Sequence, residues 1–115
     1  MRNDRERLAD IIEAAEKIHI RTQRGRGRFD ADEDLQIVLA HLVQVIGEAA
    51  ARIGDDVVTA NPQVPWRQIV GMRNRVVHDY FEIDLDILWV AVTRDVPLLA
   101  GQIHDIVDGL PGERS

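Results

Sequence analysis

The stretch from residue 33 to residue 54 carries more apolar side chains than one face of a helix can hold. One set recurs with the spacing of a helix face: Leu35, Val38, Leu39, Leu42, Val45, Ile46, Ala49 and Ile53. A second set widens that surface: Ile37, Ala40, Val43, Gly47 and Ala50. A helix that is apolar over so much of its circumference must be covered by neighbours. The pattern predicts the central helix of a bundle, or a helix that also packs in a subunit interface, with Gly47 allowing close approach of another helix.

Three further segments have helical periodicity, so we expect a single domain over residues 1–115 with helices over about 3–22, 31–54, 65–79 and 84–108. Asp30 with Glu33 has the spacing of a capping box, and Asp84 can cap the last helix. Pro97 removes one backbone donor and predicts a kink in that helix. No segment has the alternation typical of a strand. The sequence therefore predicts an all-α, up-and-down four-helix bundle.

Composition excludes several classes of protein. The chain has no cysteine, so it can form neither disulfides nor a zinc–thiolate site. His41 and His104 lack ligand spacing, and we expect no metal and no other cofactor. The apolar runs are too short to cross a membrane and the N-terminus lacks the apolar core of a signal peptide, so we expect a soluble cytoplasmic protein. The formal net charge of −6 argues against indiscriminate binding to nucleic acid.

The segment from Gly71 to Phe81 concentrates the side chains that can do chemistry. If it belongs to a helix that begins near Pro65, Arg73 lies within an apolar stripe, where its permanent charge needs an ion-pair partner, a cleft or a second chain. Asn74 and His78 are four residues apart and share a helix face. Arg73 and His78 are five apart, which separates them by roughly 140°. Both can meet one substrate if the helix ends near His78 or if two copies of the chain face each other.

This segment resembles the Arg-x4-His-x-Tyr signature of HEPN-domain toxins, specifically the HepT-like ribonucleases that are paired with minimal nucleotidyltransferase (MntA-like) antitoxins. The signature residues are Arg73, His78 and Tyr80, with Asn74 beside the arginine. The likeness spans nearly the whole chain, through Ile46-Gly47-Glu48-Ala49, Val64-Pro65-Trp66, Gly71-Met72-Arg73-Asn74, Asp84-Leu85-Asp86 and Pro97. The resemblance implies a HEPN-like homodimer in which the two signature segments line one cleft.

The resemblance also implies an activity, that of a metal-independent endoribonuclease toxin. RNA carries its own nucleophile, the 2′-hydroxyl, so the protein must supply an acid or base and charge stabilisation. His78 suits the first role, Arg73 can hold the phosphate through two hydrogen bonds, and Asn74 can orient the histidine or the ribose. In the family the tyrosine accepts AMP from the antitoxin, which implies an O-AMP-tyrosine at Tyr80. Such a phosphodiester would compete with RNA phosphate for Arg73.

Position 79 departs from the family pattern, in which glycine is common, because this chain has Asp79. A carboxylate beside His78 can favour the charged imidazole or repel RNA, and on a continuing helix it can pair with Arg75. Two readings without catalysis therefore stay open. One is a helical binding subunit of a nucleotidyltransferase complex, and the other is a structural dimerisation bundle.

Four arginines and two glycines fall between residues 21 and 28, where the helical pattern breaks. One interpretation is a flexible basic loop in which Arg24, Arg26 and Arg28 contact RNA phosphates, with Arg75 as a further candidate. The other is a solvated loop between helices. We favour the second, because Phe29 is the one aromatic residue near the arginines that can stack on a base.

Along the predicted central helix, His41, Gln44 and Glu48 form a polar strip. Such a strip can extend the wall of an active site or can be an ordinary solvated surface. We favour the second interpretation.

Overall fold

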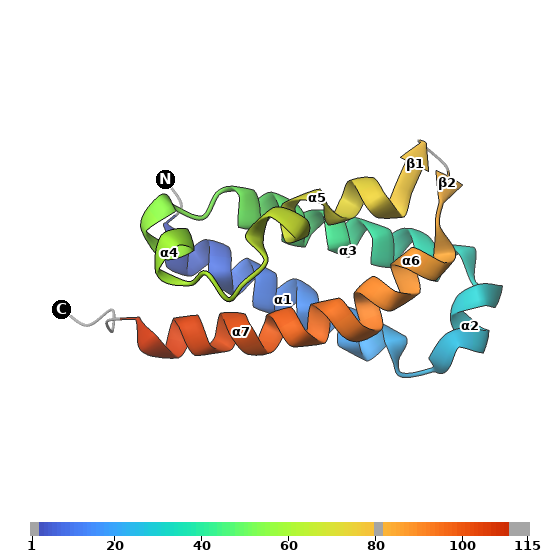
Figure 1. The fold of residues 1–115 in the computed structure, drawn as a ribbon. Coiled ribbons are helices and arrows are strands. Elements are labelled where there is room, and N and C mark those ends of the chain that lie inside the picture. The colour runs from blue at the N-terminus through green and yellow to red at the C-terminus, as the bar shows by residue number, and fades with distance from the viewer. Residues whose placement is uncertain (1–2, 80–81, 111–115) are drawn as a thin grey trace.

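The computed structural model describes residues 3–79 and 82–110, with the backbone alone at residues 78 and 79. Four long helical segments run alternately in opposite directions, which confirms the predicted all-α bundle (Figure 1). They are α1 (Asp4–Thr22), α3 (Glu33–Ala51), α5 (Trp66–Val76) and a last segment composed of α6 (Leu85–Val90), the π-helix η1 (Ala91–Asp95) and α7 (Val96–Gly109). The short elements are α2 (Gly25–Ala31), α4 (Asp55–Ala60), β1 (Val77–Asp79) and β2 (Glu82–Ile83).

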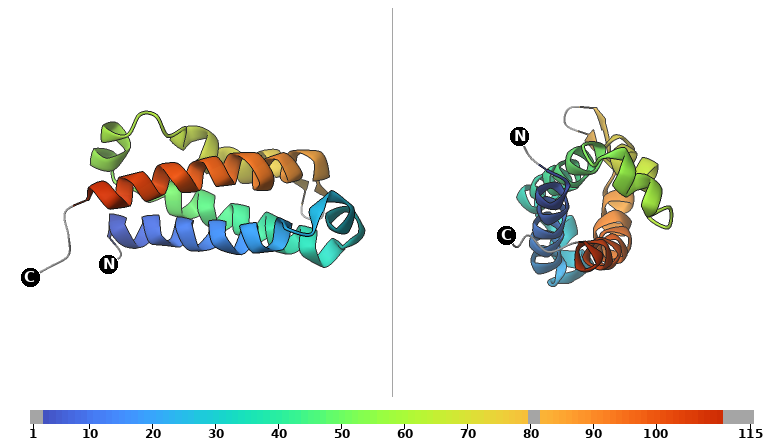
Figure 2. Two further views of the ribbon diagram at one scale, coloured as in Figure 1. Left: turned by 90° about the horizontal axis from the view of Figure 1, so that it is seen from below. Right: turned by 90° about the vertical axis from the view of Figure 1, so that its left-hand side faces the viewer.

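Helix α3 is the central helix of the bundle. It packs against α1 and against α5, and the end-on view in Figure 2 shows the helices gathered around a common core. Four members of its second apolar set are buried inside this chain: Ala40, Val43, Gly47 and Ala50. The fifth, Ile37, is 53% exposed. Helix α3 is long and apolar enough to cross a membrane, but core helices of soluble proteins pass the same test.

Gly47 marks a close approach between α3 and α5. A Cβ atom at this position would lie 3.3 Å from the carbonyl oxygen of Ile69 and 3.3 Å from that of Val70. Both are backbone atoms of α5, which move only if the helix moves. The close approach expected at Gly47 is confirmed, and it sets the position of the helix that carries Arg73.

Helix α3 begins and ends at other residues than the sequence predicted. Asp32 caps it, with a carboxylate oxygen that accepts a 3.1 Å hydrogen bond from a backbone N–H in the first turn, whereas Asp30 belongs to α2. The predicted helix over 31–54 ends at Ala51. Gly54 instead precedes α4, a short helix that the sequence did not predict.

Residues 25–31 form α2, where the glycines and arginines predicted a loop, and that prediction was wrong. Gly25 adopts a φ of 85°, a conformation that costs glycine little and turns the chain out of α1. Phe29 is fully buried and anchors the helix in the core. Two ion pairs have helical spacing, Arg26–Asp30 at 2.8 Å and Arg28–Asp32 at 3.4 Å. The buried ring and the two ion pairs stabilise the helix by more than the two glycines destabilise it.

The last helix is interrupted as predicted, and the interruption is a π-helical turn just before Pro97. A proline cannot donate a backbone hydrogen bond, and its ring crowds the carbonyl group of the residue four positions earlier, Thr93. A wider turn relieves that crowding. The N–H of Val96 accordingly donates to the carbonyl oxygen of Ala91, five residues earlier. Figure 1 shows the ribbon bending from α6 into α7.

Candidate functional site

Helix α5 ends at Val76, three residues earlier than predicted. The N–H of Val77 donates to the carbonyl oxygen of Arg73 and closes the last turn. The chain then enters β1, which pairs with β2 in antiparallel fashion, and the N–H of Asp84 donates to the carbonyl oxygen of Val76 at 2.7 Å. Two successive β-branched residues favour this change to extended backbone. The helix thus ends before His78, one of the two arrangements that the sequence allowed.

The structure separates the predicted site residues by element. Arg73 is half-buried on α5, Asn74 and Arg75 are exposed on the same helix, and His78 lies in β1. Tyr80 lies outside the described residues. Because the helix ends first, the helical spacing expected to join Asn74 to His78, and Arg75 to Asp79, does not apply.

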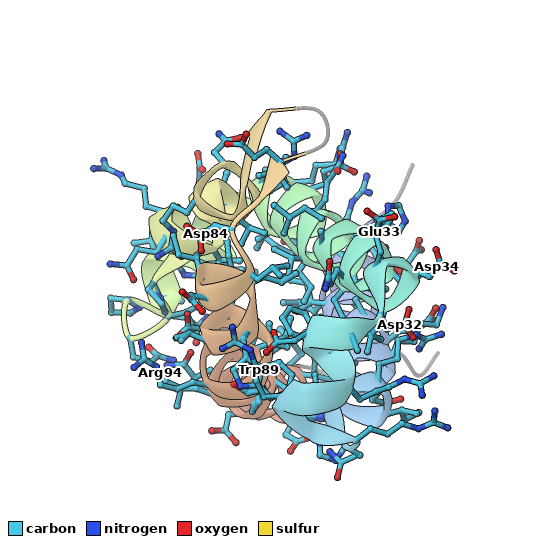
Figure 3. The ribbon with its side chains drawn as sticks, turned by 90° about the vertical axis from the view of Figure 1, so that its right-hand side faces the viewer. Asp32, Glu33, Asp34, Asp84, Trp89 and Arg94 are labelled. Carbon is cyan, nitrogen blue, oxygen red and sulfur yellow. The ribbon has the colours of Figure 1, made fainter. Side chains whose placement is uncertain are left out.

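Arg73 lines a groove of about 530 Å³ between α3, the end of α5 and the β1–β2 hairpin. Its apolar lining consists of Ile37, Ala40, Val77, Ile83 and Leu85. Its polar lining consists of Glu33, Gln36, His41, Gln44 and Arg73. Figure 3 looks onto this end of the bundle, with Glu33 at the start of α3 and Asp84 at the start of α6.

The Arg73 guanidinium makes no hydrogen bond or ion pair with any residue that the structure describes. A guanidinium keeps its charge at any pH that a protein tolerates, so partial burial favours the binding of an anion. Its planar donors match two oxygens of a carboxylate or a phosphate. The groove is therefore suited to hold an anionic group at Arg73.

Helix α3 supplies two groove residues that we expected on a solvated surface. His41 and Gln44 both line the groove with Arg73, although Arg73 is about thirty residues away in sequence. Glu48, the third member of the strip, is not part of this lining, but its carboxylate accepts a 3.1 Å hydrogen bond from the side-chain amide of Gln44. The sequence pointed to these groove residues only through their spacing of one helical turn beside an apolar face.

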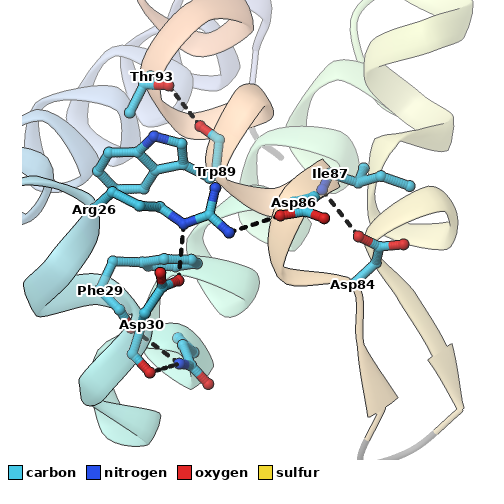
Figure 4. Close-up of polar contacts among 9 residues, drawn as sticks. Arg26, Phe29, Asp30, Asp84, Asp86, Ile87, Trp89 and Thr93 are labelled. Carbon is cyan, nitrogen blue, oxygen red and sulfur yellow. Dashed lines mark hydrogen bonds and ion pairs between the residues drawn. The ribbon is translucent and has the colours of Figure 1, made fainter.

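Arg26, a candidate for RNA binding, instead lies in an intramolecular cluster (Figure 4). Its guanidinium donates to Asp86 at 2.7 Å and to Asp30 at 2.8 Å. It also lies 5.7 Å from the ring centre of Phe29 and 5.9 Å from that of Trp89, and the two rings are 5.0 Å apart. The hydrogen bond to Asp86, followed by that to Asp30, raises the pKa of Arg26. This cluster joins α2 to α6.

Arg24 and Arg28, the other two candidates of the basic stretch, line a separate and smaller groove of about 290 Å³, together with Ile20 and Arg21. Arg28 pairs with Asp32, and Arg24 is exposed with no ion pair among residues 3–79 and 82–110. Neither side chain lines the Arg73 groove. Within those same residues, no group of three His, Asp or Glu side chains is arranged to hold a metal ion.

The fold and the groove together define a small helical bundle with a half-buried guanidinium in a groove near one end. Residues 11–106 match the family described as Ribonuclease HepT-like. A "Probable ribonuclease HepT" from Thermococcus cleftensis is 33% identical over 106 residues, which cover 91% of this chain and 96% of the relative. "Putative RNase MJ1380" from Methanocaldococcus jannaschii is 33% identical over 98 residues, 84% of this chain and 90% of the relative. No solved structure matches the chain. The chain belongs to the HepT-like ribonuclease family, as its resemblance to the signature indicated.

Proposed function

We propose that this protein is an endoribonuclease that cleaves RNA at the Arg73 groove without a metal ion. Its membership of a ribonuclease family supports the activity. The observation that carries the site is the half-buried Arg73 guanidinium, which has no partner among the described residues and lies in a groove next to the strand that contains His78. A phosphate diester is an anion that fits such a guanidinium.

In the proposed mechanism the nucleophile belongs to the substrate. The 2′-oxygen of the ribose loses its proton and attacks the adjacent phosphorus, and the bond from phosphorus to the 5′-oxygen of the next nucleotide breaks. Arg73 stabilises the charge on the non-bridging oxygens as it develops. His78 accepts or donates one of the two protons that move, because an imidazole can do either near neutral pH. The products are a 2′,3′-cyclic phosphate and a 5′-hydroxyl, with Asn74 in a supporting role.

An RNA oligonucleotide incubated with the purified protein in EDTA tests this function. We expect cleavage with a 2′,3′-cyclic phosphate end, identified by mass spectrometry. An oligonucleotide with 2′-deoxyribose at the cleaved position should resist, because it lacks the nucleophile, and the variant His78→Ala should be inactive. Cleavage of the deoxy substrate, or activity that disappears in EDTA, would contradict the mechanism.

The proposal extends to a biological role, that of the toxin in a toxin–antitoxin pair located in the cytoplasm. Its partner is an MntA-like nucleotidyltransferase that transfers AMP to Tyr80, two residues after His78 in the sequence. The phosphate diester so formed would compete with RNA for Arg73 and inhibit the enzyme. A homodimer in which both signature segments face one cleft completes the assembly.

Intact mass spectrometry tests the regulation. Co-expression with a cognate nucleotidyltransferase should add whole AMP units to the protein, located at Tyr80 by peptide sequencing, and should abolish growth inhibition. The variant Tyr80→Phe should keep its unmodified mass. An unmodified wild-type chain beside a nucleotidyltransferase that modifies other substrates would contradict the role assigned to Tyr80.

The acidic net charge and Asp79 favour one alternative, a binding subunit of a nucleotidyltransferase complex that does not cleave RNA. A carboxylate next to His78 repels phosphate, so RNA would bind weakly. Under this alternative the purified chain binds the nucleotidyltransferase and leaves RNA intact. The variant Asp79→Gly distinguishes the endoribonuclease from the binding subunit. If Asp79→Gly cleaves RNA faster than the wild type, the protein is an enzyme that Asp79 weakens.

A further inference from the structure

The wall that α3 contributes to the Arg73 groove has no assigned role. The helices α3 and α5 run in opposite directions, and Gly47 meets α5 at Ile69 and Val70. Arg73, one turn further along α5, therefore lies level with the preceding turns of α3, where Gln44 and His41 line the same groove. Two polar side chains of α3 are thus placed opposite the guanidinium.

The acidic residue of the groove lies further along the same helix. Glu33 is eight residues before His41, which corresponds to about 12 Å along a helix. It stands in the exposed first turn of α3, at the hairpin end of the groove. A phosphate is therefore repelled from that end and favoured at Arg73. The two ends of the groove therefore differ in charge, and an anion is favoured at the end near His41 and Gln44.

The polar side chains of the wall differ in whether they are available to a ligand. The amide of Gln36 donates to the carbonyl oxygens of Phe29 at 2.9 Å and Asp30 at 3.3 Å, so it is used in joining α2 to α3. The amide nitrogen of Gln44 donates to Glu48, which orients the group and leaves its carbonyl oxygen as an acceptor. His41 is exposed and makes no hydrogen bond with any residue in the described part of the chain.

We propose that His41 and Gln44 form a nucleotide subsite beside Arg73, which holds the nucleotide next to the cleaved phosphate. The inference rests on the proposed ribonuclease function. The nucleobase lies against the apolar lining formed by Ile37 and Val77, and His41 and Gln44 contact its edge or the ribose. A groove of about 530 Å³ is within the range of roughly 300–1,000 Å³ that is usual for small-molecule sites. His41 and Gln44 are positioning residues here and take no part in proton transfer.

Steady-state kinetics on a short single-stranded RNA test the subsite. The variants His41→Ala and Gln44→Ala should each raise KM about tenfold, because each loses a contact made in the bound state, while kcat stays within about threefold of the wild type. His41→Gln should have a KM between those of the wild type and His41→Ala, because glutamine also forms hydrogen bonds. The matched control is His104→Ala, on the exposed side of α7 and outside this groove.

Each other outcome overturns the subsite. An unchanged KM in both alanine variants excludes contact with the nucleotide, and a fall in kcat at unchanged KM makes these residues part of the chemistry instead. If either alanine variant has half the mass of the wild type in solution, the α3 wall is instead a contact between copies of the chain. If the wild type does not cleave RNA at all, the proposed function fails as well. If it does cleave and the variants match it, the subsite fails alone.

Discussion

Two arginines that the sequence offers as possible contacts to RNA phosphate have opposite surroundings. Arg26 donates to two carboxylates and lies beside two aromatic rings, so its charge is satisfied within the chain. Arg73 is half-buried at a groove and has no partner in the described residues. Whether a guanidinium is available to a ligand depends on the acidic groups that the fold places nearby. Asp86, which makes the shorter of the two hydrogen bonds to Arg26, is sixty residues away in sequence.

The contrast predicts a difference in stability within the basic stretch. Arg26→Ala should lower the melting temperature, because it removes the link between α2 and α6 and uncovers the rings of Phe29 and Trp89. Arg24→Ala is the matched control, since this exposed arginine has no ion pair among the described residues. Thermal unfolding followed by circular dichroism measures both. Equal melting temperatures would contradict a structural role for Arg26, and a loss of RNA binding in Arg26→Ala at unchanged stability would restore its role as an RNA contact.

Residue types carry most of what could be predicted about the site. The arginine, asparagine and histidine at positions 73, 74 and 78 identify a family and a chemistry. The favoured interpretation placed His41 and Gln44 on a solvated surface, because their relation to Arg73 is a contact between two helices about thirty residues apart. Residue spacing describes the faces of one helix. It does not say which face of α5 packs opposite a given face of α3.

At the scale of the elements, periodicity and capping predicted the long helices but did not predict the short elements α2, α4, β1 and β2. The predicted cap at Asp84 is present, with a hydrogen bond of 3.0 Å from a backbone N–H group, and Asn3 caps α1 in the same way at 2.9 Å. Helix α2 is stabilised by a buried ring and ion pairs, which local propensity does not describe. The end of α5 at Val76 depends on the hydrogen bond that Asp84 donates across the hairpin. Tertiary contacts therefore decide the short elements.

The contact between α3 and α5 predicts different effects for two glycines within helices. Gly101→Ala in α7 should raise the free energy of unfolding by about 0.5–1 kcal/mol, because a Cβ there meets nothing within 4 Å and alanine favours helix. Gly47→Ala should show no such gain and should lower stability by about 1 kcal/mol, because its Cβ meets two carbonyl oxygens of α5. Urea unfolding measures both variants. An equal gain in the two would contradict a tight contact at Gly47.

At the scale of the molecule, the groove lies toward the end of the bundle opposite the start of α1 and the end of α7. Helix α2, the start of α3, the hairpin and α6 gather at this end, as Figure 1 shows. Because α5 ends before His78, the angle expected on one continuous helix does not apply within one chain. The proposed homodimer, with both signature segments in one cleft, is a second way to bring the arginine and the histidine together. A direct test can decide between the two arrangements.

Mixing two inactive variants tests the shared cleft. Arg73→Ala and His78→Ala should each be inactive alone and should each have the mass of two chains by light scattering. Mixed dimers should recover measurable cleavage, because one cleft then contains an intact arginine from one chain and an intact histidine from the other. Mixed dimers that form and stay inactive would mean that both groups act within a single chain.

The central claim is that Arg73 binds the phosphate at which RNA is cleaved, and the rate of RNA cleavage by Arg73→Ala tests it most directly. We predict a fall of at least about 100-fold in kcat, the loss expected when one charge-stabilising donor is removed. Arg73→Lys should recover little, because a lysine cannot donate two parallel hydrogen bonds. The melting temperature and the mass in solution should not change, because no partner of Arg73 among the described residues is lost. Cleavage by Arg73→Ala at the wild-type rate would contradict the account.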